Sequence, residues 1–64
     1  MIEKALRLLT EQIDQKVKQL QEDLGTGNAK SFEDYKATCG EIKGLLTARL
    51  NIVDLQKNIE ESDD

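Results

Sequence analysis

Apolar side chains recur along residues 1–24 at steps of three and four, and this spacing limits the fold more than any other feature. The positions are Ile2, Leu6, Leu9, Ile13, Val17, Leu20 and Leu24. They fit an 11-residue repeat of about 3.67 residues per turn, which is close to the period of a relaxed α-helix. The sequence therefore predicts one amphipathic helix over residues 1–24, with its charged residues on the solvent side.

A glycine-containing stretch ends this periodicity and predicts a turn over residues 25–31. Gly25 follows the last apolar position, where a left-handed residue commonly ends a helix. Ser31 and Asp34 have the spacing of a capping box, so the next helix should begin at Phe32. A Gly-Thr-Gly run can suggest a phosphate-binding loop, but no strand precedes it and no Gly-Lys-Ser/Thr follows.

The second helix is expected over residues 32–60, because the chain has no proline and no further cluster of helix-breaking residues. The expected fold is all-α: one domain, an antiparallel two-helix hairpin with a longer second helix. Residues 61–64 complete an acidic end, where the helix dipole disfavours anions, so we expect an acidic frayed tail there.

Two apolar stripes follow the second helix, and one of them matches the first helix in an antiparallel pairing. The matching stripe contains Phe32, Tyr35, Cys39, Ile42, Leu46, Leu50 and Val53. The other stripe has heptad-like spacing and contains Leu45, Ala48, Ile52, Leu55 and Ile59. By the predicted pairing, Leu55 and Ile59 extend past the first helix, so we expect a further helix to cover this stripe.

Small residues lie beside the second stripe at four-residue intervals, at Gly40, Gly44 and Ala48. Each glycine costs about 0.8–1 kcal/mol relative to alanine inside a helix. Close approach of a neighbouring helix would offset that cost, although a tolerated surface glycine or a kink at Gly40 is the alternative. The predicted partner interface is therefore Gly40, Gly44, Leu45, Ala48, Ile52, Leu55 and Ile59.

The composition argues against most catalytic, metal and nucleic-acid functions. The chain has no histidine, no tryptophan and one cysteine, Cys39, so it lacks a histidine-dependent triad and a His/Cys zinc site. We expect no enzyme activity and no cofactor. The net charge is −4 with no basic stripe, so we expect no nucleic-acid binding. No apolar run reaches a membrane span, and the setting is expected to be soluble and intracellular.

The segment Tyr35-x3-Cys39-Gly40-x-Ile42-x-Gly44-Leu45-x2-Ala48 resembles a pattern in small helical-hairpin proteins of tailed bacteriophages. The genes of those proteins often lie in the head and portal region. The resemblance implies a small virion or head/portal assembly component that acts through helix packing, found in the host cytoplasm or in the virion.

Two hypotheses follow from the sequence. The first is a non-enzymatic structural protein that forms a homo-oligomer or docks on a larger assembly through the second stripe. The second is a small phage-encoded inhibitor or regulator that binds a host protein through the same stripe or through the acidic end.

Overall fold

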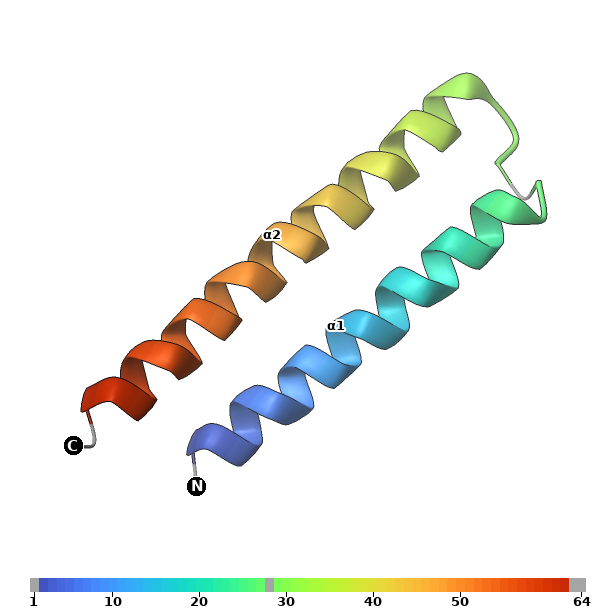
Figure 1. Cartoon of the computed structure of the whole chain (residues 1–64). Coiled ribbons are helices and arrows are strands. Elements are labelled where there is room, and N and C mark those ends of the chain that lie inside the picture. Colours follow the sequence, from blue (N-terminus) through green and yellow to red (C-terminus); the bar gives the residue numbers. More distant parts are fainter. Residues whose placement is uncertain (1, 28, 63–64) are drawn as a thin grey trace.

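Two antiparallel helices form the whole fold of the described residues, 2–27 and 29–62, in a computed structural model. Helix α1 spans Ile2–Gly25 and helix α2 spans Phe32–Ser62, with 24 and 31 residues. The helices lie side by side along their length, and both chain ends lie at the same end of the rod (Figure 1). The predicted all-α hairpin with a longer second helix is confirmed.

Helix α1 ends one residue later than predicted, and a different glycine adopts the left-handed conformation. The Thr26 N–H still donates to the Glu22 carbonyl at 3.0 Å, and the Gly27 N–H closes a tighter turn onto Leu24. Gly27 has φ of 76°, whereas Gly25 is the last helical residue. Gly25 was therefore the wrong choice for the left-handed position, because backbone hydrogen bonding carries the helix one residue further.

Ser31 caps the start of α2, as its spacing from Asp34 predicts. The Asp34 N–H donates to the Ser31 hydroxyl oxygen at 3.1 Å, and the Tyr35 N–H donates to the Ser31 carbonyl at 3.0 Å. These bonds satisfy backbone groups that have no partner inside the helix. The cap fixes Phe32 as the first residue of α2.

The core is thin and lies at the middle of the interface between the helices. Among the described residues, the buried apolar side chains are Ile13, Val17 and Leu20, all from α1. On α2, seven half-buried residues recur at steps of four and three and form the side that faces α1. They are Thr38, Ile42, Leu45, Arg49, Ile52, Gln56 and Ile59, and Cys39 and Ala48 are half-buried on either side of this row.

This side of α2 differs from the one that the sequence pairing assigned to α1. Phe32, Tyr35, Leu46, Leu50 and Val53 are exposed, so the prediction that they pack against α1 was wrong. The side of α2 that does face α1 includes the polar residues Thr38, Arg49 and Gln56. A pairing based only on apolar residues therefore did not assign this side to α1. The packing uses those polar residues, because Arg49 reaches across to Asp14 of α1.

The predicted overhang of α2 beyond α1 is also contradicted. Ile59 is half-buried, and Gln56 and Glu60 line the same surface depression as Glu3 and Arg7 of α1. Helix α1 is about 36 Å long and α2 about 46 Å. The loop between them extends along the rod rather than straight across it, and makes up the difference (Figure 1).

Helix α2 continues to Ser62, two residues beyond the predicted end at residue 60. An exposed carboxylate near a helix C-terminus costs about 0.3–1 kcal/mol, which is too little to stop a helix by itself. Asp63 and Asp64, the rest of the predicted frayed tail, lie outside the described residues.

The hairpin exposes more surface than a compact chain of its mass. Its accessible surface is 5175 Å², whereas a compact monomer of this size exposes about 4,100 Å². Its radius of gyration is 15.0 Å, against about 11 Å for a compact domain of equal length. The principal extents are 51 × 15 × 12 Å, so the fold is a rod two helices thick.

We predict that Leu20→Ala lowers the free energy of unfolding by about 2 kcal/mol, because it removes one of the few buried side chains. Leu8→Ala is the matched control, since Leu8 is on the same helix and 47% exposed. Both changes alter helix propensity equally. Urea denaturation followed by circular dichroism, at one chain concentration, measures the difference; equal losses in the two variants would contradict the assigned core.

We predict that Ser31→Ala lowers the free energy of unfolding by about 1 kcal/mol, because the Asp34 N–H loses its acceptor. Ser31→Asp should retain most of the stability, since a carboxylate also accepts this bond and suits the positive end of the helix dipole. The same denaturation series measures both variants, and a neutral Ser31→Ala would refute the cap.

Candidate interaction surface

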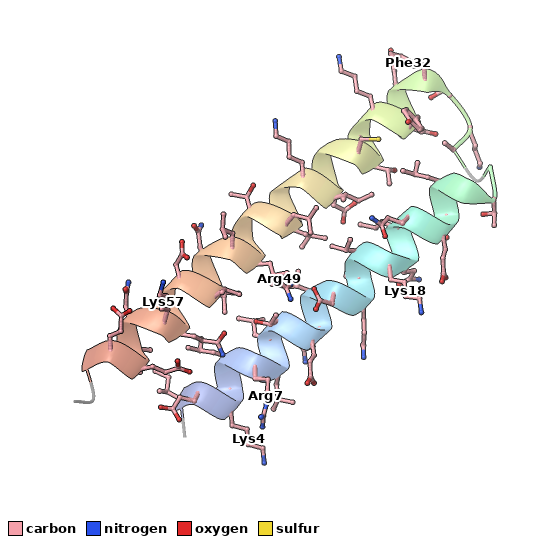
Figure 2. All side chains as sticks on the ribbon, viewed as in Figure 1. Lys4, Arg7, Lys18, Phe32, Arg49 and Lys57 are labelled. Carbon is pink, nitrogen blue, oxygen red and sulfur yellow. The ribbon has the colours of Figure 1, made fainter. Side chains whose placement is uncertain are left out.

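A row of apolar side chains on α2 is exposed in the hairpin, and we call it the exposed α2 stripe. Its exposed fractions are Phe32 75%, Tyr35 48%, Leu46 46%, Leu50 60% and Val53 37%. Phe32 lies at the hairpin end, and the stripe runs from there over about 32 Å of helix (Figure 2). Exposed apolar rows of this length are typical of surfaces that bind other molecules, so this stripe is the candidate interaction surface.

The stripe adjoins the side of α2 that contacts α1. At 100° per residue, its members fall within a sector about 60° wide, centred roughly a quarter turn from the α1-facing side. Cys39 and Ile42 are half-buried and fill the gap in this sector between Tyr35 and Leu46. Helix α2 therefore has two neighbouring contact sides, of which α1 covers one.

Charged residues follow the edge of the stripe that points away from α1. Lys36 and Lys43 lie toward the hairpin end, whereas Asp54 and Glu61 lie toward the chain ends. All four are exposed. This outer edge therefore changes sign from positive to negative along the helix, while the exposed Lys57 lies in the sector of the stripe itself, one turn beyond Val53.

The structure divides the interface that the sequence predicted. Leu45, Ala48, Ile52 and Ile59 are half-buried in the hairpin, so α1 already gives Leu45, Ile52 and Ile59 part of the cover that a partner was expected to supply. Leu55 is 47% exposed and lies on the opposite face from the exposed α2 stripe. Whether these residues also bind a partner stays a prediction.

The two glycines of the predicted small-residue row lie on open surface. A Cβ atom built on Gly40 or on Gly44 would meet no atom within 4 Å outside its own helical surroundings. Nothing within the hairpin therefore needs a glycine at either position. Close approach of another helix stays a prediction for both.

One ion pair joins the helices at mid-length. Arg49 Nε donates to Asp14 Oδ1 at 2.6 Å, and Arg49 Nη2 lies 3.4 Å from Asp14 Oδ2. Figure 2 shows Arg49 reaching from α2 toward α1. Both side chains are well exposed, at 40% and 49%, so solvent screens the attraction, and its main effect is on register rather than on stability.

The surface depressions carry no recognisable catalytic arrangement. One, near the loop, is lined by Leu20, Asp23, Leu24, Ala29, Asp34, Ala37 and Thr38. The other is lined by Glu3, Lys4, Arg7, Gln56 and Glu60. Neither holds a nucleophile beside a base. Within the part of the chain that the structure describes, no three metal-ligating side chains cluster, and neither helix is apolar enough to span a membrane.

Comparisons with protein-family models, with curated proteins and with solved structures found no match to this chain. The interpretation of the surface therefore rests on the geometry and chemistry of the hairpin itself.

Sequence reasoning found both apolar stripes of α2 but assigned α1 to the first stripe, most of which is exposed, rather than to the side that carries Leu45 and Ile52. The opposite charges of Asp14 and Arg49 could have indicated which side of α2 faces α1. The sequence pairing considered only apolar residues and did not use them. With that pair opposed, Ile52 turns toward α1 and Leu50 turns away.

We predict a coupling energy below about 1 kcal/mol between Arg49 and Asp14, falling further at high salt, because both groups are exposed. A double-mutant cycle of Arg49→Gln and Asp14→Asn, followed by urea denaturation at low and high ionic strength, measures this coupling energy. A coupling that is independent of salt would contradict a screened surface pair.

Proposed function

We propose that this protein is a non-enzymatic helix-packing protein that works by binding further helices. The observation that carries the proposal is the exposed α2 stripe, which leaves five large apolar residues in water on a chain with three buried ones among those described. Each large apolar side chain contributes about 1.5–3 kcal/mol when it is fully buried. Because the core of this chain is small, covering the stripe would add substantially to its buried apolar surface.

The shape of the surface favours a helical partner. The stripe is straight, narrow and about 32 Å long, and its side chains recur at steps of three and four. Another amphipathic helix presents ridges of the same spacing and can interdigitate with it. A small ligand would need an enclosed pocket, and the stripe is a ridge along a rod.

The resemblance of residues 35–48 to small tailed-phage proteins suggests the biological context in which this binding would occur. In that setting the protein is a component of the virion, or of head and portal assembly, and its partners are copies of itself or larger structural proteins. The alternative is a regulator that binds a host protein through the same helix.

Photo-crosslinking in the natural host tests the proposal. A benzophenone side chain is placed at Leu50 in one variant and, as the matched control, at Leu8 in another, because both leucines are exposed and lie on different helices. We expect position 50 to crosslink to one defined protein in constant ratio and position 8 to crosslink far less. Val53→Glu in the Leu50 probe variant should abolish the crosslink.

The identity of the crosslinked protein separates the possible settings. A virion or portal protein, or a second copy of the chain, supports the assembly role, whereas a host enzyme supports the regulator. Equal labelling from both positions, or none from position 50, would contradict helix packing through this surface.

A further inference from the structure

We propose that the partner of the exposed α2 stripe is a second copy of the same chain, bound through its own stripe in the antiparallel direction. This inference rests on the proposed function and names the partner. The two copies would be related by a twofold axis perpendicular to α2, near the middle of the stripe.

The apolar residues of the stripe are spaced so that two copies of α2 can pack against each other in opposite directions. When α2 is laid antiparallel on a second α2 with Tyr35 opposite Val53, Ile42 falls opposite Leu46. Cys39 then comes within one residue of Leu50. From Tyr35 to Val53, each apolar residue on this side of α2 therefore meets or adjoins an apolar residue of the other copy, whereas Phe32 falls opposite Gln56 at the end of the contact.

The charges along the outer edge agree with this orientation. A twofold axis of this kind keeps the same edge of each helix on the same side, so the edge residues of the two copies face each other. Lys36 falls nearly opposite Asp54 of the second copy, and the pair occurs twice by symmetry. In a parallel arrangement the twofold axis runs along the helices, so the outer edges of the two copies lie on opposite sides of the contact and the Lys36–Asp54 pairs do not form.

Helix α1 presents charged residues on the same face of the hairpin. Helical positions place Arg7, Asp14 and Lys18 on the face of α1 next to the stripe. The Arg49–Asp14 ion pair gives the height of α1 beside α2, and this height places Lys18 of one copy near position 20 of the other. The two hairpins then form a four-helix arrangement in which the attractive pairs come from the outer edges of α2.

The area available reaches the size of a specific interface. The exposed fractions of the five stripe residues correspond to on the order of 500 Å² of apolar surface per copy. Two copies then contribute about 1,000 Å² before the edges are counted, which reaches the lower range of specific protein interfaces. A lipid surface fits less well, because the acidic Asp54 and Glu61 border the same stripe.

Sedimentation equilibrium tests the association. We expect the wild-type chain to have twice its monomer mass at high concentration, and Leu50→Glu to raise the dimer dissociation constant at least tenfold. Leu8→Glu is the matched control and should leave the constant unchanged, because it adds the same charge at an exposed leucine of α1. A wild-type chain that stays monomeric, or equal effects of the two variants, would overturn the inference.

Disulfide trapping tests the orientation and does not depend on the stability of a charged variant. The wild-type chain carries only Cys39, which in the antiparallel pair lies about 15 Å along the axis from its copy, so it should resist disulfide formation. Leu50→Cys should give a covalent dimer under mild oxidation, through Cys39 of one copy and position 50 of the other. Leu50→Cys with Cys39→Ser should lose it.

The outcomes keep this inference separate from the proposed function. Rapid trapping of the wild-type chain through Cys39 alone would indicate a parallel pair and overturn the antiparallel inference. A monomeric chain whose stripe crosslinks to a different protein in the host overturns the second copy as partner but leaves helix packing intact. A monomeric chain with no crosslinked partner overturns both.

Discussion

The interface between the two helices is the constraint on which the rest of this structure depends, because two helices can share only one line of contact. Each helix can bury the side that faces its neighbour, and every other side meets solvent. Ile13, Val17 and Leu20 lie on the shared line and are buried. Any apolar residue off that line is exposed unless another molecule covers it. The large surface of the rod, 5175 Å², follows from this geometry.

The loop and one polar contact are consistent with a single register of the hairpin. The loop extends along the rod, so that α1 lies beside α2 as far as Glu60. The Arg49–Asp14 ion pair accompanies the rotation of α2 that turns Leu45 and Ile52 toward α1. Both charged groups are exposed, so the ion pair itself contributes little free energy to this arrangement.

Helix α2 therefore has more contact surface than the hairpin uses, and this connects the fold to the proposed function. One side holds α1, while the neighbouring side presents Leu46 and Leu50 to solvent. Residues on the first side therefore contribute to the stability of the hairpin, whereas the proposed association would depend on those of the second. Substitutions on the two sides test the two roles separately.

The sequence by itself determined both helices, the break between them and the cap at Ser31, because helical periodicity and capping are local properties. It also determined that α2 has two apolar sides. Only the tertiary structure decided which side meets α1 and how far α1 reaches along α2. Those features involve the loop path and contacts between residues far apart in sequence, such as Asp14 and Arg49. The spacing of apolar residues along one helix does not predict the loop path or the contacts between the two helices.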